Sequence, residues 1–377
     1  MMAASPPKLL YLVTEDWYFL SHRVPMALAA QRAGYEVHVA TNVDADGEAI
    51  KAYGFELHPV PWRRGSMNPF YRLDVILRLR RLYRDLRPAL AHHVALEPSV
   101  MGSMAAIGLP VICLNALAGL GFAFTSRTAK ARVSGSFARL LLRNLLRRRQ
   151  NSSLVQNADD RATLIDLGID STHIFTIAGS GVDVDYFKPM PEPKGPITAA
   201  FVGRLLDDKG VRTLIAAHEI LRRQGRPVRL LLAGDPDPAN PASISLAEIE
   251  RWKQIPDVAV LGHVDDISSV WAAAHIAVLP SRREGLPKSL LEAAACGRPI
   301  VATDVPGCRE IARQDVNALL VPADDANALA DAISRLAQDA DLRHRFGVQG
   351  RVIVEREFSD KKIGADIVAL YGRLLSR

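Results

Sequence analysis

Two glutamates eight residues apart, Glu284 and Glu292, are the residues of this sequence best placed to do chemistry. They belong to the segment 280–293, in which an apolar run ends at Pro280, a turn follows at Glu284-Gly285, and a helix is predicted from about Pro287. A helix N-terminus presents backbone N–H groups and the positive end of the helix dipole, which is typical of an anion site. A carboxylate accepts hydrogen bonds from two adjacent hydroxyls, which suits a sugar ring at one glutamate and a ribose at the other. The alternative is a capped helix with two acids in solvent.

Two cations follow another predicted strand. Arg204 ends the run Phe201-Val202-Gly203-Arg204, and Lys209 stands near the start of the next predicted helix. Two fixed cations at a strand end suit a diphosphate, which one cation alone would hold loosely. The alternative for Arg204 is a surface ion pair with Asp207 or Asp208.

Weaker candidates follow other predicted strands. Gly234 and Val264 come after two strands of the second half, in loops that could line a nucleobase. His93 ends a strand of the first half, and His22 stands beside Arg23 in a helix predicted to be capped by Ser21. A lone histidine in such a place is more often a buried, hydrogen-bonded residue than a catalytic one.

Signatures of several other function classes are absent from the sequence. No G-x-G-x-x-G follows the first strand and no G-x-x-x-x-G-K-[ST] occurs, which weakens a dehydrogenase or NTPase interpretation. No His/Cys cluster has the spacing of a metal site, so we expect neither a metal nor a cofactor.

The elements that must position these residues alternate in type along the chain. Short apolar runs alternate with amphipathic stretches, a pattern that predicts parallel sheets with helices on both faces. The predicted strands are 9–13, 36–40, 56–60, 90–94, 110–114, 153–156, 173–177, 197–202, 228–233, 258–261, 276–279 and 299–303. The predicted helices include 21–33, 69–86, 98–107, 132–150, 159–167, 211–223 and 288–296.

The 377 residues suit two domains rather than one. A charged segment with four prolines, 188–196, reads as a stiff linker, after which the strand and helix pattern restarts. We therefore expect two doubly wound α/β domains facing across a cleft: residues 1–188, and residues 189–357. The final helix, about 358–377, could pack back onto the first domain.

Cysteine content and hydropathy favour a cytoplasmic protein. The three cysteines are scattered and odd in number, which argues for a reducing compartment. The N-terminus reads as a strand rather than a signal peptide. The stretch 98–126 has no charged residue, but Pro98, Pro110 and its glycines favour a buried helix, strand and loop over a membrane span.

Positive charge is concentrated in one segment. Residues 60–150 hold 16 basic and 3 acidic side chains, whereas residues 189–377 hold 25 of each. Arginines at 78, 80, 81, 84 and 87 crowd one predicted helix, and those at 143, 147, 148 and 149 another, with leucines between them. This composition is typical of a peripheral contact with an anionic membrane. The alternative is a solvated helix face, and without an RNA-reading motif we expect no nucleic acid partner.

At these residues the chain resembles glycosyltransferase family 4 (glycosyl transferases group 1) with the GT-B fold, in the branch of capsule, O-antigen and lipid-linked-oligosaccharide transferases. The resemblance runs in order through nearly the whole chain. Its matching segments are 19–25, 119–121, 179–183, 203–210 and 284–292, the last continuing into 302–307.

The resemblance implies a metal-independent enzyme that retains the anomeric configuration of a nucleotide-sugar donor. Arg204 and Lys209 would hold the diphosphate, Glu284 the sugar hydroxyls and Glu292 the ribose. His93 loosely matches a histidine beside the donor sugar. The remaining assignments are Gly285, Leu286, Pro287 and Lys288 to the donor, with Gly234 and Val264, and Ser21, His22, Arg23, Gly119 and Gly121 to the acceptor side of the cleft.

The function expected is transfer of a hexose or N-acetylhexosamine from a UDP-sugar to a polyprenyl-diphosphate-linked saccharide, at the cytoplasmic face of the inner membrane. Cations and helix N–H groups would stabilise the charge that develops on the leaving diphosphate. Two alternatives remain open. One is a sugar-nucleotide epimerase on the same fold, and the other is a GT-B subunit that binds without catalysis.

Overall fold

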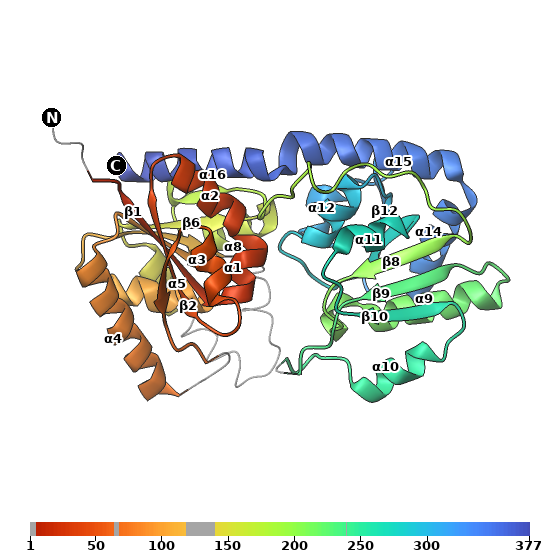
Figure 1. The fold of residues 1–377 in the computed structure, drawn as a ribbon, viewed down its shortest axis with the longest axis horizontal. Coiled ribbons are helices and arrows are strands. Elements are labelled where there is room, and N and C mark those ends of the chain that lie inside the picture. Colours follow the sequence, from red (N-terminus) through yellow and green to blue (C-terminus); the bar gives the residue numbers. More distant parts are fainter. Residues whose placement is uncertain (1–4, 64–67, 118–139, 239) are drawn as a thin grey trace. The chain divides into compact units, whose positions relative to one another are not determined.

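The structure, a computed structural model, describes residues 5–63, 68–117, 140–238 and 240–377 (Figure 1). The chain forms two compact units, one made of Met1–Ser180 with Asp360–Arg377, the other of Gly181–Ser359. Each unit contains one parallel β-sheet flanked by helices, so the predicted class of two doubly wound α/β domains is confirmed. The chain passes between the units at Ser180–Gly181, and the proline-rich segment 188–196 lies inside the second unit.

The sheet of the first unit has seven strands in the order β3-β2-β1-β4-β5-β6-β7, all parallel. Its central strands are buried along almost their whole length, as expected when helices cover both faces. The strands are β1 (Lys8–Glu15), β2 (Glu36–Asn42), β3 (Glu56–Pro59), β4 (Leu90–Val94), β5 (Ile112–Ala116), β6 (Asn151–Val155) and β7 (Ile174–Thr176).

Two hydrophobic cores lie on the two faces of this sheet. One contains Tyr11 and Phe19 with apolar residues of α2 and α16, and the other contains Leu10 and Leu12 with residues of α4 and α5. The side chains of alternate β1 residues thus pack into the cores on opposite faces of the sheet. The helices are α1 (Asp16–His22), α2 (Val24–Arg32), α3 (Gly47–Ala52), α4 (Pro69–Leu86), α5 (Leu96–Ala105), α8 (Ala158–Asp166) and α16 (Asp360–Leu375).

The C-terminal helix α16 is an integral part of the first unit. Ile363, Ile367 and Leu374 are buried in the core that it shares with α2. The Tyr371 hydroxyl lies 2.8 Å from the Tyr11 hydroxyl and 2.7 Å from His92 Nδ1. The apolar face of α16 and this buried polar cluster hold the end of the chain on the N-terminal sheet.

The beginning of the first unit differs from the helix predicted at 21–33. Helix α1 already begins at Asp16, and Ser21 lies in its last turn rather than at an N-cap. The Asp16 carboxylate is buried and accepts hydrogen bonds from the backbone N–H groups of Asp44 (2.7 Å) and Asp46 (3.1 Å). It thereby ties the loop after β1 to the loop after β2, and the chain enters a helix directly from the strand.

The second unit contains six parallel strands in the order β10-β9-β8-β11-β12-β13. They are β8 (Thr198–Val202), β9 (Arg229–Ala233), β10 (Val258–Gly262), β11 (Ile276–Leu279), β12 (Ile300–Thr303) and β13 (Ala318–Val321). The helices are α9 (Val211–Arg223), α10 (Leu246–Lys253), α11 (Ile267–Ala272), α12 (Lys288–Ala295), α13 (Cys308–Ile311), α14 (Ala326–Gln338) and α15 (Ala340–Ile353). Strand β13 and the helices after it were not predicted individually.

The suspected membrane stretch forms α5 followed by β5, with the residues from 118 onward outside the described part. Within the described ranges no helix combines the length and the apolar character that crossing a bilayer requires.

Candidate functional site

The order of the second sheet creates a topological switch point between β8 and β11. From β8 the chain proceeds to β9 and β10 on one side, and from β11 to β12 and β13 on the other. Ligands of open α/β sheets bind at the carboxyl ends of the strands at such a point. Arg204 and Lys209 follow β8, and Glu284 follows β11, so the structure brings these three predicted residues to the two strand ends that flank the switch.

Glu284 is held by two donors through one of its oxygens. Lys209 Nζ lies 2.6 Å and Ser281 Oγ 2.7 Å from Glu284 Oε1. The Glu284 side chain is 9% exposed and Lys209 is 25% exposed. Oε2 has no hydrogen bond to the described residues, so the carboxylate is fixed in direction while one oxygen stays available to a ligand. Ser281, which the sequence analysis did not single out, is fully buried.

Two glycines allow the loops of the site to approach closely. Gly210 has a positive φ of 69°, and a Cβ there would lie 2.0 Å from the Pro280 carbonyl oxygen. Gly307 has φ 80°, and a Cβ there would lie 2.5 Å from the carbonyl oxygen of Gly285. Because neither glycine has a side chain, the turn that carries Lys209 can lie against the end of β11, and the Glu284-Gly285 turn can pack on the loop after β12.

Ion pairs fasten the turn at Asp207–Lys209 to the loop that carries Glu284. Arg282 bonds to Asp207 and Asp324, and Arg283 Nη2 lies 2.6 Å from Asp208 Oδ2. Arg212 bonds to Asp207 and Glu248. The hydrogen bonds from Arg282 and Arg212 hold the pKa of the Asp207 carboxyl below its usual value. The two aspartates are thus used in scaffolding.

Arg204 pairs with a different acid from the two that the sequence suggested. Its Nη1 lies 2.5 Å from Asp237 Oδ2, in the loop after β9, and its side chain is 42% exposed. The Arg204 end of this pair is open to solvent, whereas the Asp237 side chain is 15% exposed.

Glu292 lies in the second turn of α12 and is 6% exposed. Burial raises the pKa of its carboxyl to about 6, against the opposing effect of Lys288, whose Nζ is 3.6 Å away. The helix begins after Pro287, and no side chain caps its N-terminus. The residues Gly285, Leu286 and Pro287 lead from Glu284 into this first turn, as the sequence predicts.

The loops after β9 and β10 lie at the same carboxyl edge. Gly234 donates its N–H to the Gly262 carbonyl (2.7 Å), and half-buried Val264 follows two residues later. The Tyr186 hydroxyl donates to Asp266 Oδ1 (2.7 Å), and this hydrogen bond raises the pKa of Tyr186. This hydrogen bond joins the first residues of the second unit to the loop after β10, and sequence spacing offered no signal for the pair.

His93 lies in the core of the first unit. It is fully buried in the first unit, with Nε2 2.8 Å from the Tyr83 hydroxyl and Nδ1 2.8 Å from Asn115 Oδ1. Burial lowers its pKa to about 4, so the ring is neutral at physiological pH. Both ring nitrogens of His93 are occupied within the core, which disfavours a direct contact with a substrate.

The other first-unit candidates follow β1. Arg23 is 3% exposed and shares a small pocket with Gly179 at the carboxyl ends of β5 and β6. His22 stacks on Tyr18, with ring centroids 4.2 Å apart, and Ser21 precedes it in α1. Gly119 and Gly121 lie outside the described residues.

Glu97 also lies at the carboxyl edge of the first sheet. It lies in the first turn of α5, after β4, and its Oε1 is buried without a hydrogen-bond partner among the described residues. Burial raises the pKa of its carboxyl, against the effect of Arg72. Two residues earlier, Ala95 has φ 78°, a conformation that costs energy in a residue with a side chain. The turn after β4 thus combines a left-handed residue with a half-buried acid at the switch point between β1 and β4.

Two family models match the chain. Residues 8–154 match a model described as glycosyl transferase 4-like, and residues 196–339 match one described as glycosyl transferases group 1. The first match covers most of the first unit, and the second covers the strands that carry Arg204, Lys209, Glu284 and Glu292.

Relatives and solved structures match over nearly the full length. A capsular polysaccharide biosynthesis glycosyltransferase, CapM of Staphylococcus aureus, is 25% identical over 92% of this chain and 92% of its own. An N,N'-diacetylbacillosaminyl-diphospho-undecaprenol α-1,3-N-acetylgalactosaminyltransferase of Campylobacter jejuni is 26% identical over 86% of this chain and 90% of its own. The crystal structure of HepE of Anabaena with UDP and glucose superimposes with a TM-score of 0.77, covering 97% of this chain and 99% of that one at 17% identity.

Proposed function

Since this chain belongs to the group 1, family 4 glycosyltransferases and has their GT-B fold, we propose that it is a retaining, metal-independent hexosyltransferase. Its donor is a UDP-hexose or UDP-N-acetylhexosamine, and its acceptor is a polyprenyl-diphosphate-linked saccharide. The product enters a bacterial surface polysaccharide or glycan. The observation that carries the proposal is Glu284, oriented by Lys209 and Ser281 beside Arg204 at the switch point of the second sheet.

The donor fits the arrangement group by group. Glu284 Oε2 accepts from hydroxyls of the sugar, Glu292 accepts from the ribose, and Arg204 and Lys209 hold the diphosphate between them. Arg204 exchanges Asp237 for a phosphate oxygen, which is favourable because a bidentate arginine–phosphate contact is stronger than a screened surface pair. Gly234 and Val264 border the base. The UDP in the HepE complex supports this choice of nucleotide.

The chemical step places negative charge on the leaving diphosphate. Arg204, Lys209 and the uncapped N-terminus of α12 supply positive charge before the reaction begins, so the site does not reorganise when the bond breaks. We propose front-face attack, in which the departing phosphate accepts the proton of the acceptor hydroxyl. A trapped glycosyl-enzyme adduct would contradict this route.

The acceptor and the membrane form the second part of the proposal. The name of the Campylobacter jejuni relative specifies a diphospho-undecaprenol acceptor, and that of the Staphylococcus aureus relative specifies capsule synthesis. In this chain Phe70, Leu73 and Leu77 are 82%, 54% and 56% exposed on one face of α4, amid arginines. An apolar stripe flanked by basic residues suits a helix lying on an anionic membrane, where a lipid-linked acceptor resides.

The test is a panel of UDP- and GDP-sugars offered with a polyprenyl-diphosphate-linked monosaccharide, in the presence and absence of EDTA. We expect transfer from one UDP-sugar, with the α-configuration kept and with the same rate after metal removal. Glu284→Ala should lower kcat/KM by at least about a hundredfold, since a charge-assisted contact to the reacting sugar is lost. Unchanged transfer by a folded Glu284→Ala protein would exclude the assigned site.

A further inference from the structure

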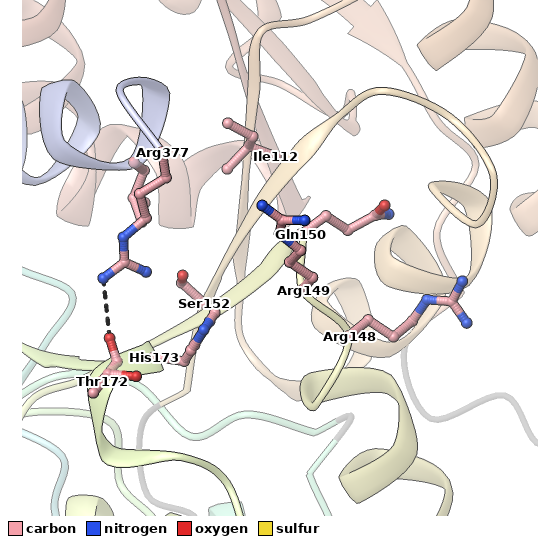
Figure 2. A pocket seen from close by; sticks show the side chains of 9 residues that line it. Ile112, Arg148, Arg149, Gln150, Ser152, Thr172, His173 and Arg377 are labelled. Carbon is pink, nitrogen blue, oxygen red and sulfur yellow. Dashed lines mark hydrogen bonds between the residues drawn. The ribbon is translucent and has the colours of Figure 1, made fainter.

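A second pocket lies in the first unit, away from the carboxyl ends of its strands. It has a volume of about 730 Å³ and is lined by residues that include Ile112, Ser152 and His173 (Figure 2). Ile112 is the first residue of β5, Ser152 is the second residue of β6, and His173 immediately precedes β7. Because these strands are parallel, the pocket lies at the amino edge of the sheet, opposite to the edge that carries Arg23 and Glu97.

Three arginines line this pocket, and no acid is among its described lining residues. Arg148 and Arg149 form no ion pair with the described part of the chain, whereas Arg212, Arg282 and other arginines are paired. Asp170, the acid closest to His173 in sequence, accepts hydrogen bonds from the N–H and hydroxyl of Thr172. Grouped cations without a counter-ion raise the electrostatic potential of a concave surface and favour an anion there.

Arg377 is already fixed in direction. Its Nη2 donates to the Thr172 carbonyl oxygen (3.2 Å), as the dashed line in Figure 2 marks, and its guanidinium carbon lies 5.4 Å from the centroid of the Phe175 ring. A guanidinium held by one hydrogen bond and an aromatic face keeps further N–H donors for a ligand. Since its rotamer is restricted before binding, less side-chain entropy is lost on binding.

Neutral donors stand beside the arginines. Ser152 is only 4% exposed, and its hydroxyl has no hydrogen bond to the residues that the structure describes. His173 Nδ1 lies 3.1 Å from the Asn151 carbonyl oxygen, which must be an acceptor, so Nδ1 carries a proton. Ile112 and Leu374 add an apolar wall to this lining.

We propose that this pocket binds a phosphate group, held by Arg149 and Arg377 and attached to a small organic body. Guanidinium groups match phosphate oxygens bidentately, which makes phosphate a better partner than a halide or a lone carboxylate. The volume exceeds that of a phosphate ion and is ordinary for a small-molecule site. The ligand is either a phospholipid headgroup or a soluble phosphorylated metabolite, and the site is separate from the proposed donor site in the second unit.

The test compares wild type with the double variant Arg149→Gln/Arg377→Gln and with Arg147→Gln, an exposed arginine of the same segment that does not line the pocket. Calorimetric titration uses glycerol 3-phosphate and inorganic phosphate, and flotation uses vesicles of phosphatidylcholine with and without phosphatidylglycerol. We expect saturable binding of glycerol 3-phosphate or anionic vesicles, weakened at least tenfold in the double variant and by less than twofold in Arg147→Gln.

The arms separate the sources of the phosphate. Loss confined to vesicle binding assigns the headgroup, and loss of glycerol 3-phosphate binding assigns a soluble ligand. The proposal would be overturned if Arg147→Gln weakened binding as much as the double variant does. It would also be overturned if the wild type showed no saturable binding of either glycerol 3-phosphate or anionic vesicles. If the double variant misfolds, Arg149→Lys replaces it, since it keeps the charge and loses the bidentate contact. Transfer to a water-soluble acceptor should be unchanged in all variants, so failure here leaves the proposed glycosyl transfer untouched.

Discussion

Ser281 is predicted to act as a positioning residue for Glu284. Its buried hydroxyl donates to Glu284 Oε1, and Thr303 in turn donates to the Ser281 carbonyl oxygen, so the loop and the carboxylate are fixed together. Removing a hydrogen bond to a charged group costs about 1.5–3 kcal/mol. Ser281→Ala should therefore lower kcat/KM for the UDP-sugar by about tenfold or more while the protein stays folded.

The control for that variant is Ser334→Ala. Ser334 lies in α14 of the same unit, is 3% exposed and accepts a hydrogen bond from Arg226 in the loop after α9. It should lose stability without losing kcat/KM. Parallel losses of kcat/KM in the two variants would mean that Ser281 acts only through general stability.

Glu292 should give the donor site a pH dependence and a stability cost. Its pKa is raised from 4.5 to about 6 by burial, so the folded protein binds this proton more tightly than the unfolded chain. The free energy of unfolding is therefore highest below pH 4.5, where the carboxyl is protonated in both states. It falls as the pH rises through 6, and at pH 8 it is about 2 kcal/mol lower. Glu292→Gln should then raise the free energy of unfolding by up to about 2 kcal/mol at pH 8 and leave it unchanged at pH 4.

The same variant should bind UDP about tenfold more weakly at pH 8, because an amide accepts from the ribose hydroxyls less strongly than a carboxylate. Urea denaturation and UDP titration at the two pH values measure the two effects. Glu250→Gln, at a side chain 63% exposed on α10, is the matched control. Tight UDP binding by Glu292→Gln would contradict the ribose role.

For single residues, the spacing in the sequence could predict which side chains lie close together but not which partner each one bonds to. Strand ends at a switch point converge, so Arg204, Lys209 and Glu284 could be expected together. The Asp237 partner of Arg204 lies 33 residues away on another loop, and local sequence carries no signal for it. The partners of His93 could not be predicted either, because a strand-end position does not reveal that Tyr83 and Asn115 occupy both ring nitrogens.

Among the elements, α4 carries the membrane prediction. Its bounds, Pro69–Leu86, agree with the sequence because Asn68 caps it and Pro69 stands at its first position. Not every arginine of this helix is available to a lipid. Arg80 donates to the carbonyls of Ala105 and Ile107 at the end of α5, and Arg78 pairs with Asp74. The apolar stripe is therefore the sharper target for mutation.

Leu73→Glu/Leu77→Glu should reduce binding to vesicles containing phosphatidylglycerol by at least about tenfold, since two apolar insertions are lost and two negative charges are added. Flotation measures the bound fraction. Leu246→Glu, at a residue 71% exposed on α10 of the second unit, should leave it unchanged. Transfer to a water-soluble acceptor should persist in both variants. Equal flotation of the α4 variant and wild type would exclude α4 as the contact.

Elements whose hydrophobic period was clear could be predicted nearly to the residue, as for β4, α9 and β11. The first βα unit could not, because the buried Asp16 carboxylate binds two N–H groups of a distant loop and lets α1 start directly after β1. Strand β13 is only four residues long and pairs along one edge with β12. The four-residue strands β11 and β12 lie inside the sheet and were predicted, so β13 differs from them by its position at the sheet edge, not by its length.

For the whole molecule, the location of all proposed donor residues in one unit leads to a testable prediction. Arg204, Lys209, Glu284 and Glu292 all belong to Gly181–Ser359, a compact unit with its own sheet. If UDP binds there, it stabilises the unit by about 2.7 kcal/mol at a hundred times its Kd, and local opening becomes correspondingly rarer. Backbone hydrogen exchange should then slow most in the segments 203–210 and 281–292, by up to about a hundredfold.

The same experiment assigns the donor nucleotide to one unit of the chain. Strands β2 and β3 belong to the first unit, which contains none of the proposed donor residues. Their backbone amides should exchange at nearly the same rate with and without UDP. Lys209→Gln should abolish most of the protection, because the diphosphate loses a fixed cation and Glu284 loses one of its two donors. Protection confined to the first unit, or unchanged by Lys209→Gln, would contradict the donor site. Protection at the switch point of the second sheet would tie Glu284 and Glu292 to one bound nucleotide.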